Sequence, residues 1–455
     1  MSPMTLADIL TASIASSEAS SVERPDTSSD EAADRAGSTR SRGDRHSALR
    51  GLVDSSAGDG ADSTLDDVTT PRARQFLQNY KCQCGRTVFF VNSRCLACGT
   101  TLGYDPVIGR VVPLEASPGE GDWHRHGRPD DLLTYRRCAN LQTPAACNWL
   151  LRGDDAAAQS LGTPYCIACR LNRTIPDLSI DRNAGRWRRI EMAKRRLVAA
   201  LVALGLPVVS KLSDPVNGLA FDFLFPVAGG PAVLTGHDNG LIVINTLEAD
   251  DAYREQVRTQ MGEPYRTLLG HLRHEVGHYY WDRLVQGTDW IDGFRRLFGD
   301  ETLNYDEALA HHYSNGPAPD WQLRHVSAYA SMHPWEDWAE SWAHYLHMVD
   351  TVATALRFGI RSDFLELDHE PFGADDLWDP HAADADAFLD LVNSWVELTG
   401  VLNELSRSMG EHDFYPFVLP RLAVAKLQFV HCVVTSRRAE TAAAKDAVPA
   451  QVVDP

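Results

Sequence analysis

His274-Glu275-Val276-Gly277-His278 is the stretch that decides how the C-terminal part of this chain folds and what it does. Residues four apart project from the same face of an α-helix, so both imidazoles can bind one Zn²⁺ at roughly 2.0–2.1 Å. Glu275, beside them, can take a proton from metal-bound water. The stretch therefore predicts a zinc-dependent hydrolase centre, with His274 and His278 as ligands and Glu275 as the general base.

The residues around this stretch predict a helix. Pro264 suits the first turn of a helix, and an apolar residue then recurs every fourth position. These residues are Leu268, Leu272, Val276, Tyr280 and Leu284. The histidines lie off this stripe, so one face would pack in the core while the other presents them to a cleft. His271 shares the histidine face, and we expect it beside the site or at the surface rather than on the metal.

A catalytic zinc needs a third protein ligand, and the best source is the segment from His333 to His347. Pro334 suits a first helical position, and four polar residues then fall along one stripe: Glu336, Glu340, His344 and His347. We predict Glu336 as the third ligand and Glu340 as the acceptor of a hydrogen bond from a ligand imidazole. Alternatively, Glu336 only complements the positive end of the helix dipole. His344 and His347 are expected to be hydrogen-bonded interior histidines.

Eight of the nine cysteines form two groups of four in the N-terminal part of the chain. The groups are Cys82, Cys84, Cys95 and Cys98, then Cys138, Cys147, Cys166 and Cys169. Closely spaced cysteine pairs fit the four thiolates of a structural zinc site, so each group predicts one zinc ion. The second group is the weaker signal, because its first two cysteines are too far apart for one tight turn.

Disulfide bonds are the alternative interpretation of these cysteines. The first eight residues, however, lack the basic region and apolar core of a signal peptide. In a reducing cytosol thiolate zinc sites are favoured over disulfides. Cys432, alone in an apolar run, is expected to be a buried core thiol.

Composition and periodicity divide the chain into four segments. Residues 1–75 are rich in Ser, Asp, Ala, Gly and Thr and predict a disordered tail, as does the Ala-rich segment 439–455. Residues 76–180 would form the zinc-ribbon module and residues 181–438 a zincin-like metallopeptidase domain. Strands are expected at 221–225 and 241–245, and helices at 386–409 and after Pro420. The predicted fold class is α+β, a small cysteine-rich β module followed by a mainly helical domain.

The net charge of −19 disfavours general binding to nucleic acid or to anionic membranes. No apolar run reaches the length of a membrane span, and we expect a cytoplasmic protein. One basic cluster, between Arg182 and Arg196, could contact phosphates. Its apolar residues have the spacing of an amphipathic helix, which favours a solvated helix face instead.

Four blocks of this sequence together resemble a known family. The blocks are Cys82-Gln-Cys84-Gly85 through Cys95-Leu-Ala-Cys98-Gly99, Cys166-Ile-Ala-Cys169 through Pro176, Gly270 through Trp281, and His333 through Glu340. Between Tyr80 and Val434 the chain is similar to the bacterial zinc-ribbon-containing zinc-binding metallopeptidases, which are gluzincin-like and carry HExxH. The resemblance implies an N-terminal zinc-binding module and a peptidase domain with His274 and His278 as ligands and Glu275 as base. It implies no particular substrate.

The predicted reaction is hydrolysis of a peptide or related amide bond with one catalytic zinc and about two structural zinc ions. Tyr329, His344 and Tyr345 are candidates for stabilising the oxyanion. An extended peptide or protein substrate would pair with a strand just upstream of the HExxH helix. The cysteine module would be structural or would bind a partner protein.

Two other functions stay open. One is a binding protein whose zinc ribbons recognise nucleic acid or protein beside an inactive zincin-like scaffold. The other is a zinc hydrolase that acts on a non-peptide amide, such as a cell-wall bond.

Overall fold

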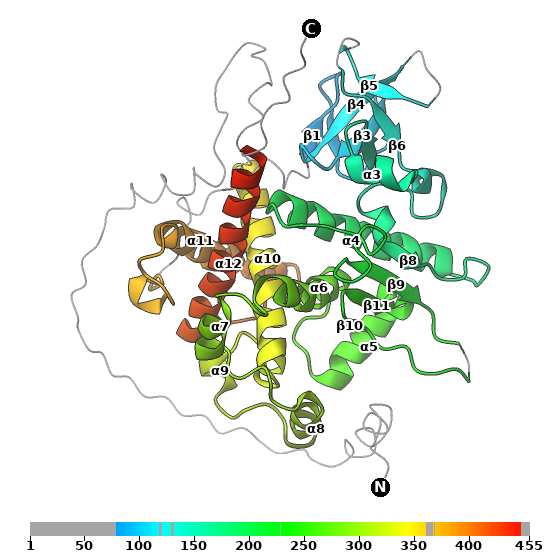
Figure 1. Ribbon diagram of the computed structural model, residues 1–455. Helices are drawn as coiled ribbons and strands as arrows, with labels where there is room; N and C mark the ends of the chain where they lie inside the picture. Colours follow the sequence, from blue (N-terminus) through cyan, green and yellow to red (C-terminus); the bar gives the residue numbers. More distant parts are fainter. Residues whose placement is uncertain are drawn as a thin grey trace.

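The computed structural model describes residues 79–446, apart from 118–120, 129–131, 228, 361–366 and 368. The predicted disordered segment 1–75 lies outside the described residues. A β-rich region that holds both cysteine groups precedes a mainly helical domain (Figure 1). The predicted α+β class is confirmed.

The cysteine-rich region contains two antiparallel sheets. Strands β1 (Asn79–Lys81) and β2 (Thr87–Phe89) form a hairpin. A five-stranded meander follows, made of β3 (Thr101–Asp105), β4 (Arg110–Ala116), β5 (Trp123–Arg125), β6 (Tyr135–Arg137) and β7 (Leu150–Arg152), after which comes helix α3 (Ala156–Leu161). The rings of Phe90, Tyr104 and Trp149 pack between the hairpin and the meander, with centroids 4.7 and 4.8 Å apart for the two closest pairs. This aromatic contact joins the two small sheets into one body.

A four-stranded sheet belongs to the second part of the chain. Its strands are β8 (Asn172–Thr174), β9 (Ala220–Leu224), β10 (Gly236–Asp238) and β11 (Leu241–Asn245), in the spatial order β10-β11-β9-β8. Pairing is parallel for β8 with β9 and for β9 with β11, and antiparallel for β10 with β11. The strands predicted at 221–225 and 241–245 are confirmed as β9 and β11.

The short edge strand β10 has no counterpart among the strands expected from the sequence. Only Asn239 and Gly240 make the turn, with φ of 47° and 78°, and His237 and Asp238 pair with β11. An Asn-Gly pair between two strands is the usual signature of a two-residue hairpin. That signature was present in the sequence.

Helix α4 (Asn183–Ala203) lies between the β-rich region and the four-stranded sheet, with α5 (Asp251–Met261) on the far side of the sheet (Figure 1). The basic cluster lies on α4, but it is not simply a solvated face. Arg186, Lys194 and Arg195 are buried, since Arg186 pairs with Asp250 and Lys194 with Glu191. The partner of Arg186 comes from a distant segment that the sequence pattern does not show, whereas Glu191 lies on α4 itself, three residues before Lys194.

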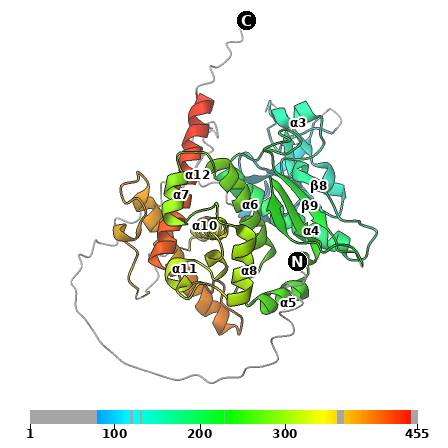
Figure 2. The same cartoon turned by 60° about the horizontal axis from the view of Figure 1, so that its bottom comes forward.

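The remaining helices are α6 (Leu268–Leu284), α7 (Ile291–Leu297), α8 (Tyr305–Asn315), α9 (Trp321–Arg324), α10 (Pro334–Arg357), α11 (Ala385–Ser408) and α12 (Arg421–Asp446). Helix α10 packs against α6, α11 and α12. Figure 2 views α10 nearly along its axis, with α6, α7, α11 and α12 around it. Trp338, Trp342 and Trp395 are each at most 1% exposed in this core.

Several predicted helix boundaries are confirmed and two are wrong. The helices predicted from Pro334, at 386–409 and after Pro420 are α10, α11 and α12. Helix α6 begins at Leu268 rather than at Pro264, because the Thr267 hydroxyl accepts from the Gly270 N–H (3.0 Å) and caps the helix there. Helix α12 continues to Asp446, past the expected start of disorder at 439, since alanine is the strongest helix former. Residues 447–455 lie outside the described part.

One apolar core runs through both parts of the protein. The buried cluster includes Tyr80 and Trp149 of the β-rich region, Trp187 of α4 and Val434 of α12. The cysteine-rich region is therefore packed onto the helical domain and is not held by a linker alone. Among the described residues, no helix combines the length and apolar character needed to cross a membrane.

Candidate metal centre

Helices α6 and α10 approach each other closely at Gly277, inside the HEVGH stretch. A Cβ added there would lie 3.1 Å from the Cα of Ala339 and 3.2 Å from the Cβ of Trp342. The indole N–H of Trp338 donates to the Gly277 carbonyl (2.9 Å). Because only glycine allows this contact, the residue between the two histidines sets the distance to the helix that carries Glu336.

The three predicted ligands come together where these helices meet. His274 Nε2 lies 2.9 Å from Glu336 Oε2, and His278 Nε2 lies 3.5 Å from Glu336 Oε1. One ligand atom from each residue falls within a group whose members are at most 4.8 Å apart. Glu336 and His278 are buried, and His274 is half-buried.

The donor set and its spacing fit zinc. Tetrahedral Zn–N and Zn–O bonds of about 2.0–2.2 Å separate the ligand atoms by roughly 3.3–3.6 Å, and the two distances above lie close to this value. Glu336 Oε2 is buried and faces His274 Nε2, with no donor when the proton of that imidazole is on Nδ1. A buried carboxylate oxygen left without a donor is costly unless a cation is bound there. Two imidazoles and one carboxylate leave a fourth position for water or substrate.

Glu340 lies where the sequence placed a partner for a ligand imidazole. Its Oε1 is 2.8 Å from His274 Nδ1, and its Oε2 accepts from the Ser327 hydroxyl (2.7 Å). A proton on Nδ1 leaves Nε2 of His274 free to bind metal. Ser327 was not singled out from the sequence, and its position three residues after a short helix gives no signal of this contact.

Glu275 lies beside the triad and is 9% exposed. Burial raises the pKa of its carboxyl group, while the neighbouring His274 and His278 oppose the shift. A carboxylate whose pKa is raised toward neutrality is a better acceptor for a proton from water. The carboxyl group of Glu275 is thus buried close to the two histidines and to Glu336.

Only one of the three oxyanion candidates borders the site. The ring of Tyr329 lies 6.1 Å from that of His274. His344 faces the Tyr415 hydroxyl (2.5 Å) and Tyr345 faces His431 (3.0 Å), so both point into the core. His344 is thereby a hydrogen-bonded interior histidine, as expected.

His347 is the second interior histidine of α10. Its Nδ1 lies 2.6 Å from Arg273 Nη1, and Arg273 also donates to Asp350 (2.6 Å). These contacts join α6 to α10 at Arg273, the residue directly before the proposed ligand His274. His347 is therefore not available to a metal at the triad.

Tyr305 is a site residue that the sequence analysis missed. Its hydroxyl donates to Glu336 Oε1 (2.8 Å) from helix α8. Burial and the Glu336 charge raise the pKa of Tyr305, so the phenol keeps its proton. Tyr305 is 31 positions from Glu336 and in no recognisable pattern, so only the fold brings it to the site.

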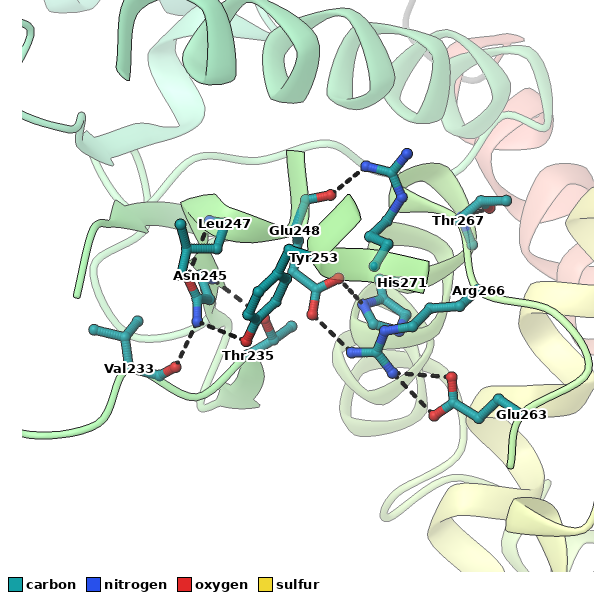
Figure 3. Close-up of polar contacts among 12 residues, drawn as sticks. Val233, Thr235, Asn245, Leu247, Glu248, Tyr253, Glu263, Arg266, Thr267 and His271 are labelled. Atoms are coloured by element: carbon teal, nitrogen blue, oxygen red, sulfur yellow. Dashed lines mark hydrogen bonds and ion pairs between the residues drawn. The ribbon is translucent and has the colours of Figure 1, made fainter. Parts of the chain in front are cut away.

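A charged cluster flanks the N-terminal end of α6 (Figure 3). Arg266 lies between Glu248 (2.7 Å) and Glu263 (2.9 Å), and His271 Nδ1 lies 3.5 Å from Glu248. Burial and the neighbouring Arg266 lower the pKa of His271, which is a neutral imidazole. His271 therefore lies beside the site and contacts Glu248. This is the first of the two positions expected for it from the sequence, beside the site or at the surface.

Both cysteine groups have the geometry of four-thiolate zinc sites. In the first, Cys82 and Cys98 are 3.6 Å apart and Cys84 and Cys95 are 3.8 Å apart, measured between sulfur atoms. In the second, the Cys147–Cys166 distance is 3.7 Å. A tetrahedron with Zn–S bonds of about 2.3 Å has an edge of roughly 3.8 Å, whereas a disulfide measures about 2.05 Å.

The two cysteine groups differ in exposure, and neither shows disulfides. All nine cysteines are free, including the buried Cys432 of α12, which was expected as a core thiol. Cys84 and Cys98 of the first group are exposed, whereas all four cysteines of the second group are buried. The disulfide alternative has no support here.

Comparison with known proteins agrees with this geometry. Residues 183–433 match a family model described as "putative zinc-binding metallo-peptidase". The chain belongs to this metallopeptidase family. Residues 79–180 of this family member match a zinc-ribbon domain. Zinc binding is thus supported by both family descriptions and by the cysteine groups.

Relatives of this metallopeptidase family member include uncharacterized proteins of Mycobacterium tuberculosis and Mycobacterium bovis. Each is 40% identical over 360 residues, which is 79% of this chain and 95% of the relative. No solved structure matches the chain.

Proposed function

We propose that the protein is a zinc metallopeptidase that hydrolyses a peptide or related amide bond. The observation that carries the proposal is the meeting of His274 Nε2, His278 Nε2 and the Glu336 carboxylate beside the buried Glu275. Zinc held by this triad would supply Lewis-acid polarisation of a carbonyl and acidification of water. Membership of the family supports this chemistry without defining a substrate.

The chain's own residues account for the proton transfers. Glu275 would take the proton of the attacking water and deliver it to the nitrogen of the leaving amine. Glu340 holds His274 in the tautomer whose Nε2 is free, and Ser327 holds Glu340. Tyr305 and Tyr329 keep their protons because burial raises both pKa values. Tyr305 donates its one proton to Glu336, so the Tyr329 hydroxyl is the donor that we assign to the oxyanion.

Strand β10 is the edge on which we place an extended substrate. It is the outermost strand on one side of the sheet, it runs antiparallel to β11, and it packs against α6. His237 on β10 has its ring 6.1 Å from that of His278. A peptide added along this edge would therefore pass the proposed metal centre.

Three variants test the assignment. Glu275→Gln should keep the zinc at the triad and lower the rate of hydrolysis by about 10²–10⁴-fold, because only the proton acceptor is removed. Glu336→Ala should lose zinc and activity together. Glu340→Ala should cost roughly 10–100-fold in zinc affinity or activity, because it acts through His274.

The measurements are zinc content and a hydrolysis screen of protein, peptide and cell-wall amides. The cell-wall arm separates a peptidase from a hydrolase of non-peptide amides. Full activity of Glu275→Gln would exclude the mechanism. If Glu340→Ala lost the zinc of the triad and Glu336→Ala kept it, Glu340 would be the ligand and Glu336 would not.

A second role, protein binding by the first zinc ribbon, is favoured by one surface feature. Leu96, between two cysteines of the first group, is 96% exposed, and Phe89 is 54% exposed. Both line a hollow of about 490 Å³. Rigid exposed apolar groups around a hollow are typical of protein contact sites. Leu96→Asp should then lower the rate of cleavage of a protein substrate and leave the rate of cleavage of a short peptide unchanged. If the substitution changed neither rate, or changed both equally, this role would be excluded.

A further inference from the structure

The second cysteine group leads directly into the sheet of the peptidase domain. After Cys169 the chain passes through a short 3₁₀ helix, Cys169–Leu171, and enters β8 at Asn172. Strand β8 pairs in parallel with β9, with Asn172 opposite Phe221. The sheet that ends at β10, beside the proposed catalytic centre, therefore takes its opposite edge strand from the zinc-ribbon segment.

Strand β8 is fixed by side chains as well as by backbone pairing. Arg173 Nε donates to Asp222 of β9 (2.9 Å). Asn172 donates to Glu191 of α4 (2.7 Å), and Glu191 also accepts from Lys194 (2.9 Å). Glu191 and Lys194 are fully buried, so this polar cluster is stable only while each member keeps its partners.

Arg195 of α4 reaches across to the second cysteine group. Its Nη2 donates to the carbonyl of Ala145 (3.1 Å), two residues before Cys147. Arg195 is 2% exposed, and its Nη1 makes no hydrogen bond but lies 3.8 Å from Glu191 Oε2, a carboxylate that Lys194 also neutralises. Four thiolates around one zinc carry a net charge of −2, so a buried guanidinium here offsets the charge of the cluster.

The second group also differs from the first in its surroundings. All four of its cysteines are 0–3% exposed and belong to the apolar core that continues through Leu171 and Trp187, whereas of the first group only Cys82 and Cys95 belong to that core. Helix α4 packs against α6, the helix of the HEVGH stretch. A continuous set of contacts therefore leads from the second cysteine group through α4 to the catalytic helix.

We propose that the second Cys₄ site is the structural zinc site of the peptidase domain itself, holding β8 and α4 in place, with Arg195 as its charge partner. The first Cys₄ site, two of whose cysteines are exposed, would hold only the β1–β2 hairpin around it. Loss of zinc from the second site should then destabilise the catalytic sheet and the packing of α4 on α6. Loss from the first site should not.

The test compares two single substitutions in the full chain, Cys166→Ser and Cys95→Ser. The readouts are zinc count by native mass spectrometry and hydrogen exchange of β8, β9 and α4, neither of which depends on hydrolysis. Each variant should lose one zinc. Cys166→Ser should lose exchange protection over β8, β9 and α4, whereas Cys95→Ser should keep it. Equal protection of these segments in both variants would overturn the proposal.

Arg195→Leu keeps every cysteine and tests the proposal if Cys166→Ser does not fold. Loss of a buried charge partner should weaken zinc binding at the second site by roughly 10–100-fold, measured as zinc passed to a chromogenic chelator. Hydrogen exchange of the β8 amides should become faster as zinc is lost from the second site. Arg189→Leu is the matched control, because Arg189 lies on the same helix, is half-exposed and pairs with Asp250. Zinc release from Arg195→Leu at the control rate would refute the role of Arg195.

Discussion

Gly277→Ala tests whether the distance between α6 and α10 sets zinc affinity. The new Cβ would lie 3.1–3.2 Å from Ala339 and Trp342, closer than ordinary contact. Trp342 is fully buried, and the contacted atom of Ala339 is its Cα. Neither residue can therefore move aside unless helix α10 moves as well. The methyl group can be accommodated only if α10 moves away from α6 by a few tenths of an ångström.

The magnitude follows from two opposing terms. Replacing glycine by alanine inside a helix contributes about 1 kcal/mol of stability, whereas overpacking a core costs about 1–3 kcal/mol. The free energy of unfolding should therefore fall by only about 0–2 kcal/mol. To bind zinc, the triad needs α6 and α10 at their original separation. Binding must therefore bring the helices back together against the added methyl group. A strain of about 1–2 kcal/mol raises the dissociation constant of the third zinc by a factor of roughly 5–30.

The assay is competition for zinc with a chromogenic chelator, alongside urea unfolding. Gly400→Ala is the control, because Gly400 lies inside α11, which carries no proposed ligand, and its added Cβ meets only Leu367 at 3.4 Å. Within the part of the chain that the structure describes, no closer contact opposes the added methyl group, so that variant should keep its zinc affinity and gain up to about 1 kcal/mol of stability. If Gly277→Ala bound the zinc at the triad as tightly as Gly400→Ala does, the glycine contact would not control the metal centre.

Three further predictions concern the metal sites. Reduced protein prepared without chelator should contain about three zinc ions, two in Cys₄ sites and one at the triad, and elemental analysis that finds one or none would contradict this count. A thiol-reactive mercurial should release zinc from the first Cys₄ site before the second, because Cys84 and Cys98 are exposed and the second group is buried; simultaneous release would argue against this order. Tyr329→Phe should keep the zinc at the triad and lower kcat by about 10²–10³-fold, and an unchanged kcat would remove Tyr329 from the oxyanion site.

The parts of the site that could be predicted from the sequence are those set by local spacing. Two histidines four apart share a helix face, and Glu336 and Glu340 share another, so each pair could be predicted from helical periodicity alone. The short cysteine spacings likewise predicted two thiolate groups. These are short-range patterns, and the structure brings each set together.

The parts that were missed depend on contacts between distant segments. Tyr305 reaches Glu336 of the triad from helix α8, and Ser327 reaches Glu340 from the loop after α9, and only the folded chain determines the direction of these segments. Burial of Arg186 and Arg195 required partners 64 and 50 positions away. Helix α12 passed the expected boundary because alanine-rich composition was interpreted as disorder rather than as helix propensity.

The pairing of β8 with β9 has a practical consequence for the isolated catalytic region. A protein that begins at residue 181 would lack β8 and would leave one side of β9 with unpaired N–H and C=O groups. Strand β9 has the sequence Ala-Phe-Asp-Phe-Leu, and Phe221 and Phe223 are fully buried in the intact chain. Open sheet edges of apolar character add strands from other molecules. Such a truncated protein should aggregate on expression, whereas one that begins before Cys138 carries the strand that caps the sheet.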